Sequence, residues 1–231
     1  MPNKFRFLLL YPPIAILVLA AMYGYGYLET ENDLLQLRQK ELLNANLAAF
    51  ELNRDLESLK LDLRYLSYNL NFQAVLDHAS DQNLSELAND LVIFSNSKMI
   101  YDQIRWIDEQ GKERLRVDYK NGNAVIIANE QLQNKAQRYY YSESVSLKPG
   151  SIYFSPLDLN IENGEIERPL KPTIRIATPV INSQGQQRGI LILNYLASYM
   201  LDSFAQVTKE ITDHVSLINR DGYWIKSPDS S

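Results

Sequence analysis

Three patterns of hydrophobic and polar residues follow one another along the chain. Residues 7–28 form an apolar run without a charged residue, and as a helix this run matches the roughly 30 Å thickness of a bilayer core. Residues 29–78 contain no glycine or proline and repeat an apolar residue at every seventh position. Beyond residue 100, apolar and polar residues alternate between short turns, which is typical of strands. We therefore expect a transmembrane helix, a long stalk helix and a sheet-containing domain.

The charges beside the apolar run predict its orientation. Lys4 and Arg6 precede the run, whereas three acidic residues follow it within residues 29–33. Because positive residues favour the cytoplasmic side, we expect residues 1–6 in the cytoplasm and the rest of the chain outside. A cleaved signal peptide is the competing interpretation, but its apolar core is shorter, about 7 to 15 residues, and no convincing cleavage site follows the run.

The long helix has two interpretations. Apolar residues follow the alternating three- and four-residue spacing of a coiled-coil seam, and they form two sets: Leu35, Leu42, Ala49, Leu56, Leu63 and Leu70 in one, and Ala45, Leu52, Leu59 and Leu66 in the other. These sets predict a homodimer through the long helix. Further apolar residues such as Leu43 and Phe50 widen the stripe, so the same helix could equally pack against its own domain. Both interpretations can hold along different parts of the helix.

The remaining pattern predicts an α+β domain with an antiparallel sheet of five to six strands. A second helix is expected over residues 83–97, with Asp81 or Ser85 as its cap. The later elements are a hairpin over 101–119, a helix and crossing loop over 130–147, strands around Asn163-Gly164 and over 172–196, and a helix over 197–207.

Three turns share the pattern Ile, Asp or Asn, two residues, Gly: residues 107–111, 181–185 and 218–222. In each turn a polar side chain can close the loop and glycine can take the positive φ that ends it. The third turn belongs to a hairpin expected over 214–226. An isolated hairpin is marginal in water, so this one is expected to begin a second domain.

Composition and spacing exclude several functions. A net charge of −5 without a basic run argues against a nucleic-acid partner. The absence of cysteine excludes disulfides, thiolate metal sites and a cysteine nucleophile. His78 and His214 are the only histidines and lack the spacing of a metal pair, and no glycine-rich phosphate loop is present. We therefore expect no catalytic residue, metal or cofactor in this chain.

The stretch of residues 137–156 carries the strongest signal for a ligand. Arg138 precedes three consecutive tyrosines, Tyr139, Tyr140 and Tyr141. A guanidinium binds a carboxylate through a planar pair of donors, and tyrosine adds an aromatic face with a hydroxyl, so the combination suits a small organic anion or an amino acid. For Tyr139 and Tyr141 we favour packing on the sheet, whereas for Arg138 and Tyr140 packing and ligand binding are equal alternatives.

Five further residues join the candidate site. Tyr153 and Ser155 share one face of a strand, because side chains two apart point the same way. Asp158 could bind an ammonium group or cap a turn. Arg175 alternates with core residues and faces either a ligand or solvent. Arg105 alternates in the same way, and a cross-strand ion pair is the simpler explanation for it.

The candidate ligand-binding residues are therefore Arg105, Arg138, Tyr140, Tyr153, Ser155, Asp158 and Arg175. Two other arginines, Arg114 and Arg116, alternate with apolar residues on one arm of the first hairpin. We expect both of them to lie on a solvated face.

The order of five segments resembles the double Cache sensor region, also called PDC or tandem PAS-like, of bacterial transmembrane receptors. The segments are the apolar helix running into the long helix, QIRWIDEQGKERLRVDY, RYYYSES, IYFSPLDLNIENGEIERPLKPTIRIATPV and INSQGQQRGILILNYL. The resemblance covers residues 30–226. The sensor modules of histidine kinases and diguanylate cyclases are more similar than those of amino-acid chemoreceptors.

This resemblance implies a function and a location. Residues 79–207 would form a membrane-distal PAS-like module that binds a small molecule between its sheet and the crossing loops, and binding would shift the long helix. Residues 208–231 would begin an incomplete membrane-proximal module. The sensor would lie in the periplasm or outside the cell, anchored in the bacterial cytoplasmic membrane, and a kinase or cyclase output domain would lie beyond this chain. The alternative is a membrane-anchored dimeric structural or interaction protein without a small-molecule pocket.

Overall fold

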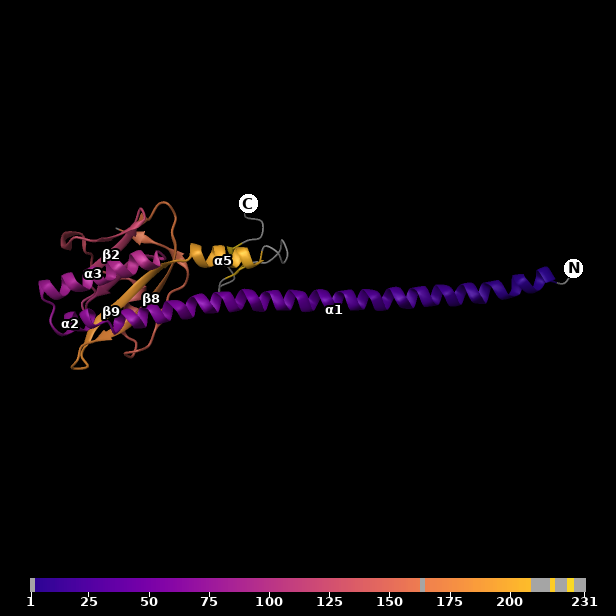
Figure 1. The fold of residues 1–231 in the computed structure, drawn as a ribbon, viewed down its shortest axis with the longest axis horizontal. Coiled ribbons are helices and arrows are strands. Elements are labelled where there is room, and N and C mark those ends of the chain that lie inside the picture. Colours follow the sequence, from indigo (N-terminus) through magenta and orange to yellow (C-terminus); the bar gives the residue numbers. More distant parts are fainter. Residues whose placement is uncertain (1–2, 163–164, 209–216, 219–223, 227–231) are drawn as a thin grey trace. The chain divides into compact units, whose positions relative to one another are not determined.

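The computed structural model describes residues 3–162, 165–208, 217–218 and 224–226. The chain divides into two compact units, of which one comprises residues 1–50 and 207–231 and the other residues 51–206. Helix α1 (Asn3–Ser67) begins in the first unit and continues into the second (Figure 1). The second unit contains the sheet and all the candidate site residues.

In the first unit, the part of α1 that the structure describes from Tyr11 onward includes a segment long and apolar enough to cross a membrane, and no residue of that segment is buried. Leu35 and Leu42, two of the expected seam residues, are exposed on this part of the helix. The third repeated turn, residues 218–222, lies mostly outside the described residues. The strands on either side of it, β10 (Leu217–Ile218) and β11 (Trp224–Lys226), pair antiparallel as expected for a hairpin.

The second unit is built on one antiparallel sheet in the order β3-β2-β1-β9-β8-β4. The strands are β1 (Tyr101–Ile107), β2 (Glu113–Lys120), β3 (Asn123–Ile126), β4 (Tyr153–Phe154), β8 (Pro172–Ile181) and β9 (Gln187–Leu196). The two-residue β5 (Asp158–Leu159) also pairs with β8. Six strands in this order confirm the α+β prediction, and β5 extends it by one short strand.

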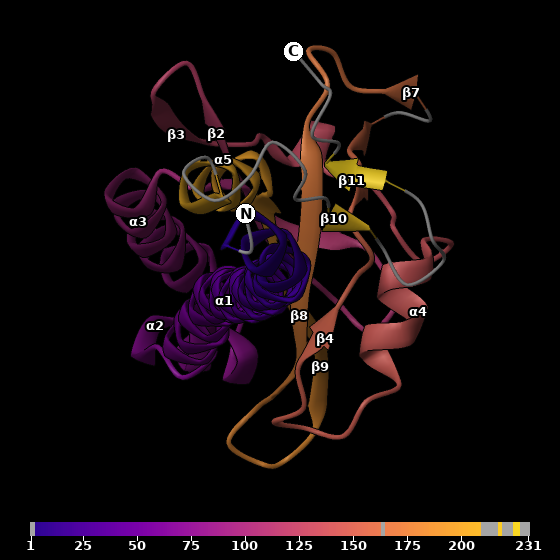
Figure 2. The same ribbon diagram turned by 90° about the vertical axis from the view of Figure 1, so that its right-hand side faces the viewer.

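Helices cover one face of the sheet. The end of α1, α2 (Leu70–Asp77) and α3 (Asp81–Lys98) lie on this face, and α4 (Tyr139–Val145) lies on the other (Figure 2). Leu59, Leu63 and Leu66 of α1 are buried in the core beneath the helices. For this part of the long helix, packing against its own domain is therefore the correct interpretation.

The long helix ends earlier than the sequence predicts. A single helix was expected through residue 78, but α1 ends at Ser67 and α2 begins at Leu70. Asn69 caps α2, because its side chain accepts a hydrogen bond of 3.1 Å from the backbone N–H of Phe72. Helix α3 is capped in the same way by Ser80, rather than by Asp81 or Ser85.

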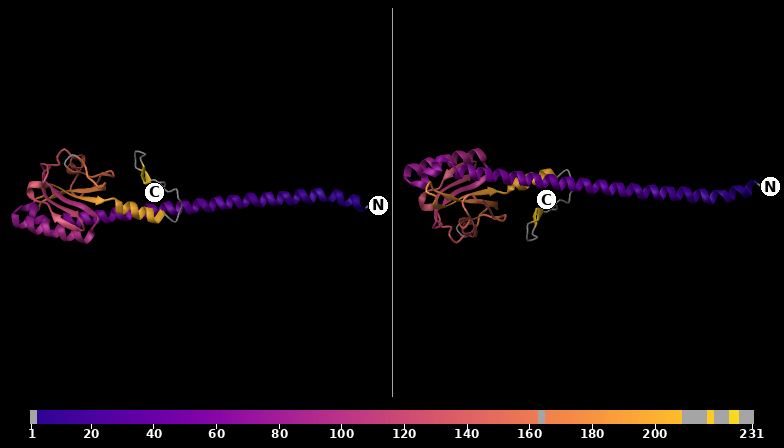
Figure 3. Two further views of the ribbon diagram at one scale, coloured as in Figure 1. Left: turned by 90° about the horizontal axis from the view of Figure 1, so that it is seen from above. Right: turned by 90° about the horizontal axis from the view of Figure 1, so that it is seen from below.

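The segment between β3 and β8 crosses the face opposite the helices, and edge-on views show its loops and the helices on opposite sides of the strands (Figure 3). It contains a short 3₁₀ helix (Asn129–Gln131), α4, β6 (Ile161–Glu162) and β7 (Glu165–Ile166). The expected order over 130–147, a helix followed by a crossing loop, is wrong, because the loop comes first and α4 follows it. The expected turn at Asn163-Gly164 lies outside the described residues, between the paired β6 and β7. Helix α5 (Ser198–Thr208) follows β9 as expected.

Two of the repeated turns close as predicted. The carboxylate of Asp108 accepts hydrogen bonds from the backbone of Gln110 and Lys112, and the side chain of Asn182 does the same for its own turn. Gly111 and Gly185 have positive φ values of 78° and 74°. The chemistry of the turn residues therefore defines these hairpins locally.

Candidate ligand-binding site

The face of the sheet opposite α1 to α3 carries buried charges. Arg105 on β1, Glu113 and Arg116 on β2, and Arg175 on β8 are all at most 5% exposed. Strand alternation places Arg105 on this face while its neighbours Ile104 and Trp106 enter the helix-side core. The sheet thus supplies rigid positions for several guanidinium groups beneath the crossing segment.

Tyr140 brings three of the predicted arginines together. The guanidinium carbons of Arg105, Arg138 and Arg175 lie 5.9, 5.7 and 4.9 Å from the centre of its ring. Arg105 also lies 3.5 Å from the Tyr140 hydroxyl. Separations of about 6 Å or less are within the range of cation–π attraction. Guanidiniums from three elements therefore converge on one aromatic ring: from β1, from the start of α4 and from β8.

Two of these guanidiniums are paired with carboxylates. Arg105 lies 3.2 Å from Glu113, and both side chains are fully buried. Arg175 pairs with Asp158 through Nη1 and donates from Nη2 to the amide oxygen of Asn160 at 3.1 Å. Arg138, by contrast, forms no ion pair with any residue that the structure describes. Arg138 therefore places beside the Tyr140 ring a cation that no described carboxylate pairs with.

The other predicted residues surround Arg175. The Ser155 hydroxyl accepts a hydrogen bond of 2.9 Å from the Arg175 backbone N–H and donates to the Pro156 carbonyl. Tyr153 pairs with Ala177 in the sheet and packs against the small apolar cluster that contains Tyr140. Burial raises the pKa of Tyr153, and the nearby carboxylate of Glu143 raises it further. The sheet, α4 and the loop after β4 therefore bring the seven predicted residues together around Tyr140 and Arg175.

The two flanking tyrosines differ from each other. Tyr141 is buried and donates a hydrogen bond to the Asp108 carbonyl at 2.9 Å, so the packing interpretation is confirmed for it. Tyr139 is 37% exposed and donates to the second oxygen of Asp158. Burial and then the Asp158 carboxylate raise the pKa of Tyr139 to about 12, so the hydroxyl remains a donor at neutral pH. Tyr139 therefore positions Asp158 in addition to packing on Tyr140.

Arg116 corrects the sequence analysis. It was expected in solvent, but its side chain is only 6% exposed and binds Asp118 through two nitrogens, at 2.6 and 3.0 Å. Lys120 lies 2.8 Å from the same carboxylate. Arg114, which was also expected in solvent, is 42% exposed, and that prediction is confirmed. Alternation alone does not distinguish a solvated face from one that a later segment covers.

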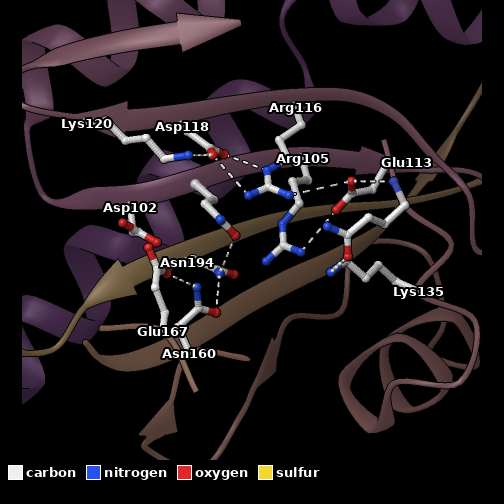
Figure 4. A network of polar contacts seen from close by, with 12 residues as sticks. Asp102, Arg105, Glu113, Arg116, Asp118, Lys120, Lys135, Asn160, Glu167 and Asn194 are labelled. Carbon is white, nitrogen blue, oxygen red and sulfur yellow. Dashed lines mark hydrogen bonds and ion pairs between the residues drawn. The ribbon is translucent and has the colours of Figure 1, made fainter. Parts of the chain in front are cut away.

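Sequence reasoning missed a polar network beside the site, and Figure 4 shows its members Asp102, Glu167 and Asn194. Lys171 donates to Asp102 and Glu167, both at 2.7 Å, and Asn194 donates to Gln103 at 3.0 Å. Burial raises the pKa of Asp102 although Lys171 acts in the opposite direction. Burial lowers the pKa of Lys171, but the hydrogen bonds to its two carboxylates raise it more.

A pocket of about 480 Å³ lies at the edge of this network. Its walls come from β2, from the loop after β3 and from the loop before β8. The lining side chains are Arg116, Asp118, Lys120, Ile127, Glu130, Gln131, Leu132, Gln133 and Glu167. Four charged side chains of the walls are already paired within the protein: Arg116 and Lys120 with Asp118, and Glu167 with Lys171.

Several solved structures share this fold. A domain of a sensory box/GGDEF family protein from Vibrio parahaemolyticus has a TM-score of 0.70 at 24% identity, over 85% of this chain and 73% of that one. The extracellular domain of the histidine kinase vpHK1S-Z8 has a TM-score of 0.70 at 23% identity, over 86% and 71%. The ligand-binding domain of the Campylobacter jejuni chemoreceptor Tlp3 in complex with L-valine has a TM-score of 0.62 at 11% identity, over 84% and 71%. These similarities establish the fold.

A family model for the sensor domain of bacterial histidine kinases matches residues 48–231. No curated protein matches the sequence. The match to the family model covers most of the chain and all of the residues gathered around Tyr140 and Arg175. The resemblance to the sensor regions of bacterial receptors is thereby confirmed, and this chain belongs to the family of bacterial histidine kinase sensor domains.

Proposed function

We propose that this sensor domain binds a small carboxylate or amino acid at the site around Tyr140 and Arg175. The convergence of three guanidiniums on the Tyr140 ring carries the proposal, and one of them, Arg138, forms no ion pair with any described residue. A planar guanidinium is suited to a carboxylate, and the tyrosine rings provide apolar area beside it. Binding of L-valine and of isoleucine by the Campylobacter jejuni chemoreceptor Tlp3 supports the same class of ligand for this fold.

In this proposal the signal passes from the site to α1 through β1, which contacts both. This strand holds Arg105 at the site and Tyr101 at its first residue, and the Tyr101 hydroxyl donates a hydrogen bond to Asp62 of α1. A ligand that binds one conformation of the site more tightly shifts the equilibrium of the elements attached to it. The ligand therefore acts on α1 through β1, and the signal travels along the long helix.

The chain is anchored in the bacterial cytoplasmic membrane in this proposal. Residues 7–28 span the bilayer, residues 1–6 lie in the cytoplasm, and the sensor lies in the periplasm or outside the cell. The apolar stretch of α1, none of which is buried, supports the anchor, because exposed apolar area of this length needs a nonpolar environment. Residues 79–207 act as the membrane-distal module, residues 208–231 begin the proximal one, and a histidine kinase or cyclase output would belong to the remainder of the receptor.

The exposed leucines on α1 favour a homodimer as part of the same receptor. Leu35 is 54% exposed and Leu42 is 67% exposed, and they are seven residues apart. In parallel coiled coils such residues face the same positions of a second copy. An anchored dimer without a small-molecule pocket is the alternative function, and it rests on these leucines alone.

A thermal-shift screen of the full chain in detergent micelles tests the ligand. The probes are the twenty amino acids, carboxylates of two to six carbons and amines of the same size. A ligand at 100 times its Kd stabilises the native state by about 2.7 kcal/mol, which is a rise of a few degrees in Tm. We expect a carboxylate or an amino acid to raise the Tm, and Arg138→Ala to abolish the rise.

Arg114→Ala is the matched control, because it removes an arginine of the same sheet that is 42% exposed and lies outside the site. This variant should keep the response. A folded protein that responds to no probe would contradict the proposed ligand class and would favour the alternative dimer function. A response that survives Arg138→Ala would place the ligand elsewhere.

A further inference from the structure

The two carboxylates that neutralise the arginines of the site differ in accessibility. Glu113, the partner of Arg105, is fully buried and also accepts a hydrogen bond of 3.0 Å from the Gln133 backbone N–H. The side chain of Asp158, the partner of Arg175, is 34% exposed. Its other hydrogen bond comes from Tyr139, which is itself partly exposed. Glu113 is therefore a permanent part of the interior, whereas Asp158 can leave its partner for solvent.

Arg175 has a side-chain N–H donor that its present partners leave without an acceptor. Its side chain is 1% exposed, and its Nε has no hydrogen-bond partner among the residues that the structure describes. Asp158 accepts from one N–H of Nη1 and Asn160 accepts from one N–H of Nη2. A buried donor without an acceptor costs about 1–3 kcal/mol. A carboxylate that approached Arg175 edge-on would accept from two donors at once, which is the stronger geometry for this pair.

We propose that Asp158 is an internal substitute for the ligand, and that the carboxylate of a small organic acid displaces it from Arg175. This inference rests on the proposed function and specifies its chemistry. The essential group of the ligand is the carboxylate, bound over the Tyr140 ring between Arg175 and Arg138. An ammonium group is not required. The charge at Arg175 stays balanced during the exchange, because one carboxylate replaces another and Asp158 moves into solvent.

The exchange also connects the site to α5 through β5 and β8. Asp158 belongs to β5, which pairs with β8 at Thr173 and Pro172. The Pro172 carbonyl accepts a hydrogen bond of 2.9 Å from the backbone N–H of Ala197, at the residue that precedes α5. Release of Asp158 removes the side-chain anchor of β5 on Arg175. The contacts of β5 and β8 next to the start of α5 therefore differ between the free and the ligand-bound protein.

Competition by Asp158 lowers the apparent affinity of the ligand. A site that is open for only a fraction of the time binds more weakly by that fraction. Asp158→Asn preserves the size of the side chain and an oxygen acceptor for Tyr139, but it removes the charge that holds Arg175. We expect the Kd of the variant for an organic acid to be about tenfold lower than that of the wild type.

Isothermal titration calorimetry of the full chain in micelles measures this change with three matched probes. These are L-valine, 3-methylbutanoate, which lacks the amino group, and isobutylamine, which lacks the carboxylate, together with any acid that raises Tm in the ligand screen. We expect Asp158→Asn to tighten binding of the acids and to leave isobutylamine unbound. Asp202→Asn, an exposed change of the same charge on α5, should alter none of the affinities.

A second variant separates displacement from altered folding. Tyr139→Phe leaves the charge of Asp158 in place and removes only one of its two anchors, so it should tighten binding of the acids by a smaller factor. Weaker or unchanged binding of the acids by Asp158→Asn would overturn the exchange while leaving the proposed function intact. If the variant lost binding of L-valine alone, Asp158 would be the partner of an ammonium group. Absence of binding to every probe by both wild type and variant would overturn the proposed function itself.

Discussion

The hydroxyl of Tyr101, at the first residue of β1, donates a hydrogen bond of 2.7 Å to the carboxylate of Asp62 in α1. Lys98 of α3 lies 2.7 Å from the other oxygen of the same carboxylate. Burial, followed by the effect of Asp62, raises the pKa of Tyr101, so the hydroxyl remains protonated and the bond persists at neutral pH. One buried polar contact thus ties the long helix to the strand that carries Arg105.

Tyr101→Phe should lower the free energy of unfolding by about 1–3 kcal/mol, because it leaves the buried Asp62 oxygen without its donor. Urea denaturation of the full chain in micelles measures the loss. Tyr65→Phe is the matched control, since Tyr65 lies on the same helix and is 65% exposed. Equal stability of Tyr101→Phe and the wild type would show that the contact does not hold α1 to the sheet.

Gly189 allows the strands at the centre of the sheet to approach each other. Its φ is 92°, and a Cβ at this position would lie 1.9 Å from the Ile107 carbonyl oxygen. Gly189→Ala should therefore destabilise the protein by about 3 kcal/mol or more, through both backbone strain and the clash. Gly150→Ala is the control, because Gly150 has a φ of 83° but no atom within 4 Å of the added Cβ. That variant should lose only about 1–2 kcal/mol in a thermal or urea melt. If the two variants lost similar amounts of stability, the clash at Gly189 would not explain the loss.

The helices show what an apolar pattern can and cannot predict. The heptad repeat correctly predicted a long helix, and Leu59, Leu63 and Leu66 enter the core as a seven-residue pattern allows. The pattern did not reveal the break before Leu70, because the apolar spacing continues across it. Asn69 begins α2 through its own capping bond, and its extended backbone does not continue α1. That bond depends on a local competition between side chain and backbone, which periodicity does not measure.

The site was predictable where chemistry and alternation agreed. Arg138 and Tyr140 stood in one motif, and Arg105 and Arg175 alternated with core residues, which indicated that each arginine points away from the helix-side core. The contact between Lys171 and Asp102 could not be inferred. A register shift between Tyr101 and Gln103 interrupts the alternation there. A bulge of this kind changes which side chains share a face, and the sequence carries no separate signal for it.

Asp102 should make stability depend on pH. Burial raises its pKa in the folded protein above the unfolded value of about 3.9. A group shifted in this direction adds stability below the unfolded pKa and loses it as the pH rises through the folded pKa. The free energy of unfolding of the wild type, relative to Asp102→Asn, should therefore be greater at pH 4 than at pH 7. Urea denaturation of both proteins at the two pH values measures the difference.

Asp202→Asn serves as the control for this pH dependence. Asp202 is exposed on α5, and its removal should leave the difference between pH 4 and pH 7 unchanged. If the wild type gained no stability over Asp102→Asn at pH 4, Lys171 rather than burial would dominate the pKa of Asp102.

The proposed dimer can be tested with single cysteines, because the natural chain contains none. Leu42 is 67% exposed and belongs to the apolar seven-residue repeat. In a parallel pair of helices this position faces its own copy, so Leu42→Cys should form a disulfide-linked dimer on mild oxidation in membranes. Lys40→Cys lies about 200° away around the helix and should link slowly. Non-reducing gel electrophoresis measures both rates. Equal rates at the two positions would mean random collision rather than a seam, and would remove the leucine repeat as a reason for a dimer.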